Sequence, residues 1–265
     1  MGRCAGRGVR GADYPGRVIL GIDTSLGSAV AVVEPDGVIR SEVRSLDPRG
    51  HAEVIGTLLE RAMAEASVTP SDITHVAAGM GPGPFTGLRV GIAAARTFAL
   101  GRGLPVVPVV SHDAVALELL LHSALTADWG FVGDVEDGAA ETFAVVTDAR
   151  RREFAYTLYR GIDDDGLPIR VAEPALVPRD DLDAALAHAE AARRDADHIP
   201  AAMLALAAAR ALSAGRTIGH ADALYLRSPD VTLPHAPKRV NPPAPGEQRT
   251  PVAAERQHDR RRDEA

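Results

Sequence analysis

Short apolar runs that end on an acidic residue organise the first half of the chain. "VILGID" covers residues 18–23, and "SAVAVVEPDGVIRSEV" follows with turn-forming residues at 35–37. Runs rich in β-branched residues and separated by turn formers are typical of strands. This pattern predicts a strand ending at Asp23, then a second strand and a hairpin that leads into a third.

Helical spacing of the apolar residues begins after this hairpin. Between residues 51 and 66 they recur three to four positions apart, which predicts a helix. "ITHVAAGMG" then predicts a short buried strand, and residues 88–100 predict a second helix. "PVVPVV" predicts the start of another strand segment, which ends at Ser111.

The second half repeats this order of elements. "TFAVVTDARRREFAYTLYRGIDDDGLPIRVAE" again places an apolar strand before an acid, Asp148, and continues with a second strand, an Asp-Gly turn and a third strand. Helices are predicted over residues 180–194 and 201–214. Because a repeated order of elements indicates internal duplication, we expect a duplicated α/β protein with an N-terminal lobe (17–115) and a C-terminal lobe (116–230), each with a mixed sheet and flanking helices.

The two ends of the chain and its overall composition narrow the class of protein. Residues 1–16 are an irregular leader without the apolar centre of a secretory signal, and residues 231–265 are dense in proline and charge, so both are predicted to be disordered. The one cysteine supports no disulfide framework, and no apolar run is long enough to cross a bilayer. We therefore expect a cytoplasmic protein. The net charge of −7 argues against a protein that grips nucleic acid unaided.

The acids that end the two first strands are candidate nucleotide ligands. A strand-acid-hairpin unit present twice resembles the plan of the actin, hexokinase and Hsp70 (ASKHA) superfamily, in which the two hairpins hold the phosphates of ATP. Such a clamp needs small residues after each acid so that backbone N–H groups can approach phosphate. Asp23 is followed by "TSLGS", but Asp148 is followed by "ARRRE". We interpret Asp23, Thr24, Ser25 and Asp148 as remnants of a degenerate nucleotide site, and we expect no cofactor and no nucleotide hydrolysis by this chain alone.

A simpler interpretation is also open for both acids. Asp at a strand end readily accepts hydrogen bonds from the amides of the turn that follows it. In that case neither acid serves a ligand.

The glycine-rich loop "GMGPGPFTGLRVG" has the outline of a phosphate cradle but lacks its chemistry. It has no Walker lysine, and its two prolines remove N–H donors. Thr86 is predicted instead to cap the N-terminus of a helix. We assign the loop to starting that helix, through Gly81, Gly83, Thr86 and Arg89.

The helix that follows carries minimal side chains every four residues, at Gly87, Gly91, Ala95 and Ala99. Small residues let another backbone approach closely. The stripe can therefore pack against this protein's own sheet or meet a helix of a second chain, and the spacing alone leaves both open.

The sequence offers little for metal or hydrolase chemistry. The nine histidines form no HxxxH or HExxH pair, and there is no GxSxG motif. We expect no metal site.

Five stretches, taken in order, resemble the bacterial TsaB (YeaZ) family. They are "ILGIDTSLGSAVAVV", "HAEVIGTLLERAMAEA", "GMGPGPFTGLRVGIAAARTFAL", "VVTDARRREFAYTLY" and "ALYLRSPD". The resemblance covers about residues 18–230, and the loop through residues 85–89 is its most diagnostic part. The family usually has serine where this chain has Pro84, so any hydrogen bond from that hydroxyl is absent here.

This resemblance implies an actin-like (ribonuclease H-like) ASKHA fold and a role in tRNA modification. The family is a non-catalytic partner of TsaD, which places a threonylcarbamoyl group on the adenosine next to the anticodon of ANN-decoding tRNAs. It further implies that the ATPase TsaE joins the complex, that tRNA is contacted only indirectly, and that the chain can form a homodimer through the same helices. By position, the interface residues would be Ile55, Leu59, Ala62, Gly87, Gly91, Ala95 and Ala99.

Two other functions stay open at this point. The first is an active small-molecule kinase or ATPase of the same superfamily, which would need intact phosphate and adenosine loops. The second is a glycoprotease-like metalloenzyme, which would need the histidine pair that the sequence lacks.

Overall fold

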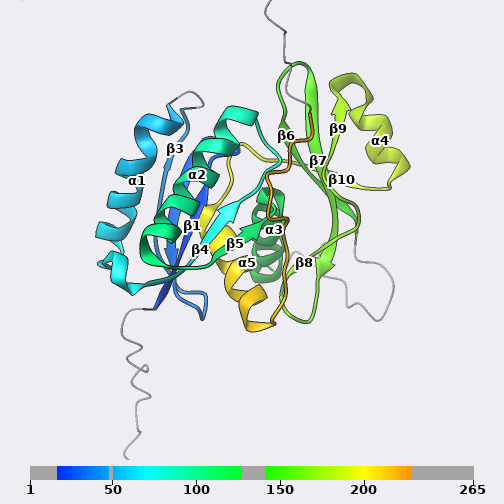
Figure 1. Ribbon diagram of the computed structural model, residues 1–265. Coiled ribbons are helices and arrows are strands. Elements are labelled where there is room, and N and C mark those ends of the chain that lie inside the picture. Colours follow the sequence, from blue (N-terminus) through cyan, green and yellow to red (C-terminus); the bar gives the residue numbers. More distant parts are fainter. Residues whose placement is uncertain (1–16, 48–49, 127–140, 228–265) are drawn as a thin grey trace, which may run out of the picture. The chain divides into compact units, whose positions relative to one another are not determined.

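Two mixed β-sheets and the helices packed on them make up residues 17–47, 50–126 and 141–227, which this computed structural model describes (Figure 1). The predicted disordered leader (1–16) and tail (231–265) lie outside the described residues, so both stay predictions.

The first sheet has the strand order β3-β2-β1-β4-β5. Strand β2 pairs antiparallel with β1 and β3, while β4 pairs parallel with β1 and β5. Every residue of β1 and β2 is buried, which fits unbroken apolar runs in strands covered on both faces. The strands are β1 (Val18–Asp23), β2 (Ser28–Val33), β3 (Ile39–Ser45), β4 (Ile73–Gly79) and β5 (Val106–Val109).

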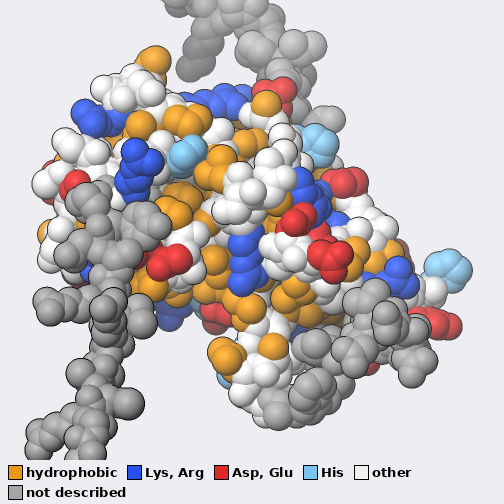
Figure 2. Space-filling view, turned by 90° about the horizontal axis from the view of Figure 1, so that it is seen from below, with side chains coloured by type: hydrophobic (Ala, Val, Ile, Leu, Met, Phe, Trp, Pro, Cys, Tyr) orange, Lys and Arg blue, Asp and Glu red, His pale blue; other side chains and the backbone are white. Residues whose placement is uncertain are grey.

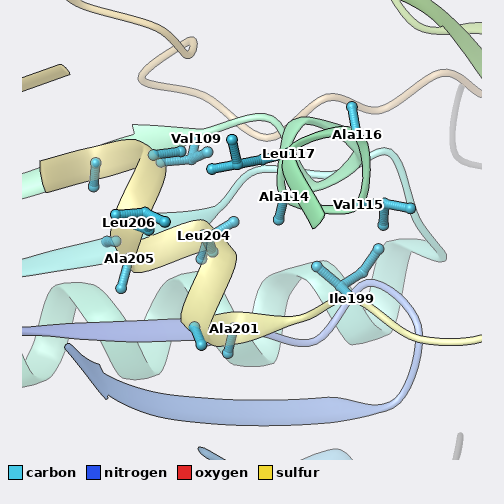
Figure 3. Packing of buried hydrophobic residues seen from close by; sticks show 14 of the residues in the cluster. Val109, Ala114, Val115, Ala116, Leu117, Ile199, Ala201, Leu204, Ala205 and Leu206 are labelled. Atoms are coloured by element: carbon cyan, nitrogen blue, oxygen red, sulfur yellow. The ribbon is translucent and has the colours of Figure 1, made fainter. Parts of the chain in front are cut away.

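Helices cover both faces of this sheet. Helices α1 (His51–Glu65) and α2 (Phe85–Arg102) pack on one face, where their apolar residues form one core cluster with the sheet. Helix α5 (Ala201–Ser213) packs on the other face against β1 and β2. Helix α3 (Ser111–Thr126) packs in turn against α5, with Leu117 and Leu204 among the residues between them (Figure 3).

The second sheet repeats the pairing of the first. Its order is β10-β6-β7-β8, with β9 also paired to β7. Strand β7 is antiparallel to β6 and β8, and β10 is parallel to β6. In the first sheet, β2 is likewise antiparallel to β1, and β4 is parallel to it. This match confirms the duplicated actin-like α/β fold. The strands are β6 (Phe143–Asp148), β7 (Glu153–Ile162), β8 (Pro168–Arg170), β9 (Ala175–Pro178) and β10 (Ala192–Asp195).

The predicted helix over residues 180–194 is wrong in its second half. After the 3-10 turn η3 (Arg179–Asp181), α4 (Leu182–His188) ends early and residues 192–195 form β10. The sequence of β10, "ARRD", does not alternate between apolar and polar residues. Strand β10 lies at the edge of the sheet, and its exposed side can be polar. Helix α3, over residues 111–126, was also not predicted from the sequence.

The predicted division between lobes falls inside α3, and α5, from the second half of the chain, packs on the first sheet. The boundary at residue 115 therefore stays a prediction. None of the helices in the described ranges has both the length and the apolarity needed to cross a membrane.

Candidate functional site

The turn after β1 holds the first predicted acid in a closed hydrogen-bond network. Asp23 is buried, and its Oδ1 accepts a hydrogen bond from the backbone N–H of Ser25 at 2.7 Å. Its Oδ2 accepts hydrogen bonds from the hydroxyls of Ser25 (3.1 Å) and Ser111 (2.5 Å). Burial raises the pKa of the Asp23 carboxyl, while these hydrogen bonds lower it.

The glycine-rich loop lies directly on this turn. The N–H of Gly81 donates to the hydroxyl of Ser111 at 3.0 Å, so one amide that a phosphate would need is already used. A Cβ on Gly83 would lie 2.8 Å from the Cα of Ser25, and one on Gly79 would overlap the carboxylate of Asp23. The loop and the turn therefore fill the space that a phosphate clamp would keep open.

Thr24 connects the same turn to α2. Its hydroxyl donates to the carbonyl of Gly87 at 2.6 Å and accepts from the N–H of Gly91 at 2.9 Å. Thr24, Ser25 and Asp23 thus lie together, as the sequence predicts, but each contacts the chain's own groups.

Asp148, the second predicted acid, lies at the end of β6 on the other sheet. Its Oδ1 accepts from the N–H of Arg150 at 2.8 Å, and the guanidinium of Arg179 lies 2.9 Å away. Burial alone would raise the pKa of Asp148, but these contacts hold it below its usual range. Both acids therefore bond a turn amide, as the simpler interpretation of the sequence predicts.

The small-residue stripe of α2 faces inward. Gly87, Gly91, Ala95 and Ala99 are all buried in this chain. A Cβ on Gly87 would lie 2.6 Å from the carbonyl oxygen of Thr24 and 3.2 Å from the imidazole of His51. The prediction that the stripe itself forms an interface with a partner is therefore corrected: its close approach serves the protein's own turn and helix α1.

The predicted interface residues on α1 divide in the same way. Ala62 is fully buried and Ile55 is 9% exposed, because both belong to the core cluster beneath the helices. Leu59 is half-buried and borders the surface.

An apolar strip that the sequence pattern did not single out flanks these buried faces. We define the helix face as those half-buried apolar residues of α1 and α2 that pack against the core cluster and follow one another at four-residue spacing. Its members on each helix are spaced by four residues, so they lie along one side of their helix. The helix face consists of Leu59, Met63, Val90, Ala94 and Phe98.

Helix α2 begins earlier than predicted, so Thr86 is not its N-cap. The N-cap is Pro84, with φ −60° and ψ 137°, and Thr86 is an exposed residue in the first turn. Phe85 already belongs to the helix, where its ring lies 4.6 Å from that of Tyr225 and 3.7 Å beneath the guanidinium of Arg89. This aromatic anchor and the fixed φ of proline start the helix without a hydroxyl cap.

Residues 216–227, which we call the strap, connect elements of both sheets (orange in Figure 1). Arg216 pairs with Asp163 and Asp165 of the β7–β8 turn, at 2.6 and 2.7 Å. Further along, the N–H of Leu224 donates to the carbonyl of Met80 at 2.7 Å, and Arg227 pairs with Glu153 of β7.

A second buried polar network joins α3 to β6 and β7. The ring nitrogens of His112 lie 2.8 Å from the hydroxyl of Thr157 and 2.9 Å from that of Thr147, and burial lowers its pKa to about 3. The neighbouring Asp113 accepts from the hydroxyl of Tyr159 at 2.7 Å and lies 3.2 Å from the guanidinium of Arg170. Burial raises the pKa of Asp113 to about 7, against the opposing effect of Arg170.

Basic, acidic and hydrophobic side chains are mixed on the face shown in Figure 2, so charges of one sign do not dominate it.

Within residues 17–47, 50–126 and 141–227, no three His, Cys, Asp or Glu side chains are placed to share a metal ion. The expectation that the chain has no metal site stays a prediction.

Comparison with known protein families matches residues 43–165 to the model of TsaD, the tRNA N6-adenosine threonylcarbamoyltransferase. An uncharacterised protein of Mycobacterium tuberculosis is 36% identical over 167 residues, covering 62% of this chain and 67% of that protein. A tRNA N6-adenosine threonylcarbamoyltransferase of Streptococcus pneumoniae is 40% identical over 109 residues, or 35% of this chain and 32% of the enzyme.

Two solved structures share the fold. A Pseudomonas aeruginosa protein with similarity to the peptidase YeaZ has a TM-score of 0.58 and 25% identity, covering 80% of this chain and all of that one. YeaZ from the same organism has a TM-score of 0.57 and 22% identity, covering 76% and 96%.

Proposed function

Because the chain belongs to the TsaB (YeaZ) family, we propose that it is the non-catalytic partner of a TsaD-type transferase. The complex would transfer a threonylcarbamoyl group to the adenosine next to the anticodon of ANN-decoding tRNAs. The match to the TsaD family model and the YeaZ-like fold support a role connected with this tRNA modification.

The single observation that carries the non-catalytic part is the closed turn at Asp23. In a working phosphate clamp the acid and the following amides must be free to meet phosphate or its metal ion. Here the carboxylate of Asp23 takes three hydrogen bonds from Ser25 and Ser111, and the loop at Gly83 lies against Ser25. The chain's own groups occupy these positions, so the clamp cannot act without rearrangement of both segments.

The partner role is supported by the helix face. Apolar residues that stay half-exposed along two adjacent helices lose unfavourable contact with water when a second protein covers them. Each helix contributes a large apolar side chain to this face, Leu59 from α1 and Phe98 from α2. We propose this face, in place of the stripe itself, as the surface that meets the TsaD-type subunit.

The same proposal includes the rest of the complex. A TsaE-type ATPase would join the two proteins, and tRNA would be contacted only through the assembled complex, since the chain has a net charge of −7. In the absence of the TsaD-type subunit, the helix face could pair with a second copy of the chain. The expected compartment is the cytoplasm.

Co-expression with the TsaD-type subunit of the same organism tests the proposal. The wild-type chain should co-purify with that subunit. In an assay that supplies the TsaE-type ATPase and a threonylcarbamoyl donor, tRNA should be modified only when both proteins are present. Phe98→Glu and Leu59→Glu place a charge on the helix face and should abolish co-purification. Leu125→Glu is the matched control, because Leu125 is 86% exposed on α3, away from that face.

Circular dichroism of each purified variant separates loss of binding from loss of folding. Retained association in both folded helix-face variants would contradict the proposed surface. Steady ATP turnover by the isolated chain would contradict its non-catalytic role and support a kinase or ATPase instead.

A further inference from the structure

A groove of about 530 Å³ runs beside α2 where the strap passes over that helix. It shares no residue with the helix face. Its lining comes from Arg89, Ile92, Ala93, Arg96, Thr97, Asp222, Ala223 and Tyr225.

The floor of the groove is apolar and its rim is basic. Ile92 is 6% exposed and, with Ala93 and Ala223, gives a shallow apolar base. Arg89 and Arg96 are exposed on the rim.

Both arginines are held in place by groups other than carboxylates. The Nε of Arg89 donates to the hydroxyl of Tyr225 at 3.3 Å, and its guanidinium lies over the ring of Phe85. Arg96 donates through Nη2 to the carbonyl of Ala221 at 2.6 Å. These contacts restrict each side chain and so reduce the entropy that binding would cost.

Among the described residues, no partner is found for most of their donor groups. A guanidinium carries five N–H donors, and each of these two uses one in the contacts above. In the part of the chain that the structure describes, neither forms an ion pair with a carboxylate. Two fixed positive charges beside an apolar floor call for a ligand that has both carboxylates and an apolar side.

We propose that this groove binds an acidic amphipathic helix of a partner protein. Arg89 and Arg96 are seven residues apart, which is two helical turns, or about 10.5 Å along the axis of α2. Carboxylates two turns apart on a partner helix match this separation and can each meet one guanidinium in a bidentate pair. An apolar side chain between them would rest on Ile92 and Ala93.

The same features disfavour nucleic acid as the ligand. Phosphate recognition gains little from an apolar floor, and only two basic residues line the groove of a chain with a net charge of −7. A protein helix uses the floor and the rim together.

Asp222 allows a prediction in the opposite direction, which would not be expected if these residues were only structural. It lines the strap side of the groove, is exposed, and would repel an approaching carboxylate. Removing the arginine charges should weaken binding, whereas Asp222→Asn should strengthen it.

A synthetic helical peptide with Glu at positions i and i+7 and Leu at i+3 and i+4 is the first probe. Its binding to the full chain is measured by fluorescence anisotropy at low and moderate salt. Arg89→Ala and Arg96→Ala should each weaken it about two- to fivefold, and the double Arg→Glu variant by more than about tenfold. Asp222→Asn should tighten binding. Arg160→Ala, at an exposed residue of β7, is the control that matches the charge change of each single alanine variant.

Two further probes complete the test. A peptide with Gln in place of both Glu residues should lose the dependence on the arginines. An RNA hairpin and inorganic phosphate are measured in parallel. Arginine-dependent binding of RNA or phosphate without binding of the acidic peptide would overturn the inference, and so would a peptide affinity unchanged in the double variant.

The identity of the partner rests on the proposed function, but the chemistry of the groove does not. The groove variants are therefore also tested for co-purification with the TsaD-type subunit. If the wild type binds the peptide and not that subunit, the proposed function fails and the groove stands. If the subunit binds and neither it nor the peptide responds to the arginines, the groove fails and the proposed function stands.

Discussion

Thr24 and Gly91 form a contact that leaves no room for a side chain at position 91 of α2. The hydroxyl of Thr24 accepts a hydrogen bond from the N–H of Gly91 at 2.9 Å, and a Cβ at this position would overlap that oxygen. The turn after β1 and the helix after the glycine-rich loop are thereby fixed to each other. The two segments that suggested a ligand site stabilise the fold together.

Gly91→Ala should destabilise the isolated chain. Replacing glycine by alanine inside a helix usually stabilises it by up to about 1 kcal/mol, but here the added methyl group forces Thr24 to move. We expect a net loss of about 1–3 kcal/mol in the free energy of unfolding, measured by urea denaturation. Gly101→Ala is the matched control on the same helix, because nothing lies within 4 Å of its added Cβ, and it should stabilise. Equal effects of the two substitutions would refute the contact.

Thr24→Val should also destabilise the isolated chain. The cause here is the loss of hydrogen bonds, because the volume of the side chain hardly changes. The substitution keeps the shape of the side chain but leaves the N–H of Gly91 and the carbonyl of Gly87 without the hydroxyl that bonds both. Loss of partners for buried polar groups costs about 1–3 kcal/mol, which chemical denaturation can resolve. Thr24→Ser retains the hydroxyl and should recover most of that loss. A valine variant as stable as the wild type would show that these bonds contribute nothing.

These contacts explain why the sequence predicted the fold well and the site only in part. Unbroken apolar runs ending at Asp23 and Asp148 need burial on both faces of a sheet, so the strands and their duplication follow from the pattern. The direction in which the Gly91 stripe faces does not follow, because minimal side chains suit a helix packed on its own turn as well as one packed on another chain. Only the position of Thr24, 67 residues away in sequence, decides between them.

The missed elements have a related cause. Strand β10 is short and polar because it is an edge strand whose register is set by pairing with β6, a long-range relationship. Helix α3 is apolar around most of its circumference, since it lies between α5 and the second sheet, and so it lacks the amphipathic spacing that marks surface helices. The Asp113–Arg170 pair joins residues from different halves of the chain, which spacing cannot reveal.

His112 should make the protein less stable on acidification. Its pKa is lowered from 6.5 to about 3 because burial disfavours the imidazolium. The unfolded chain therefore binds a proton below pH 6.5 that the folded chain does not, and the stability present above that pH is lost as the pH falls. Urea denaturation at pH 7 and pH 5 should show the advantage of the wild type over His112→Asn shrinking by about 2 kcal/mol. An advantage that does not change with pH would mean that the imidazole is accessible to protons in the folded state.

Asp113 should act in the opposite direction over much of the same range. Burial raises its pKa from 3.8 to about 7, so in the folded chain it holds a proton that the unfolded chain has released. The stability it contributes is present below pH 4 and is lost as the pH rises toward 7. In the wild type the effects of His112 and Asp113 on stability therefore largely offset each other between about pH 4 and 6.5, and removing one residue should reveal the effect of the other.

Asp113→Asn should lose stability steeply as the pH falls below 6.5, whereas His112→Asn should lose it as the pH rises from 4 to 7. Asp164→Asn, an exposed acid at the β7–β8 turn, is the control and should follow the wild-type profile. The free energy of unfolding of all four proteins is measured by urea denaturation at half-unit steps of pH. Parallel dependence on pH would contradict the opposed pKa shifts of His112 and Asp113.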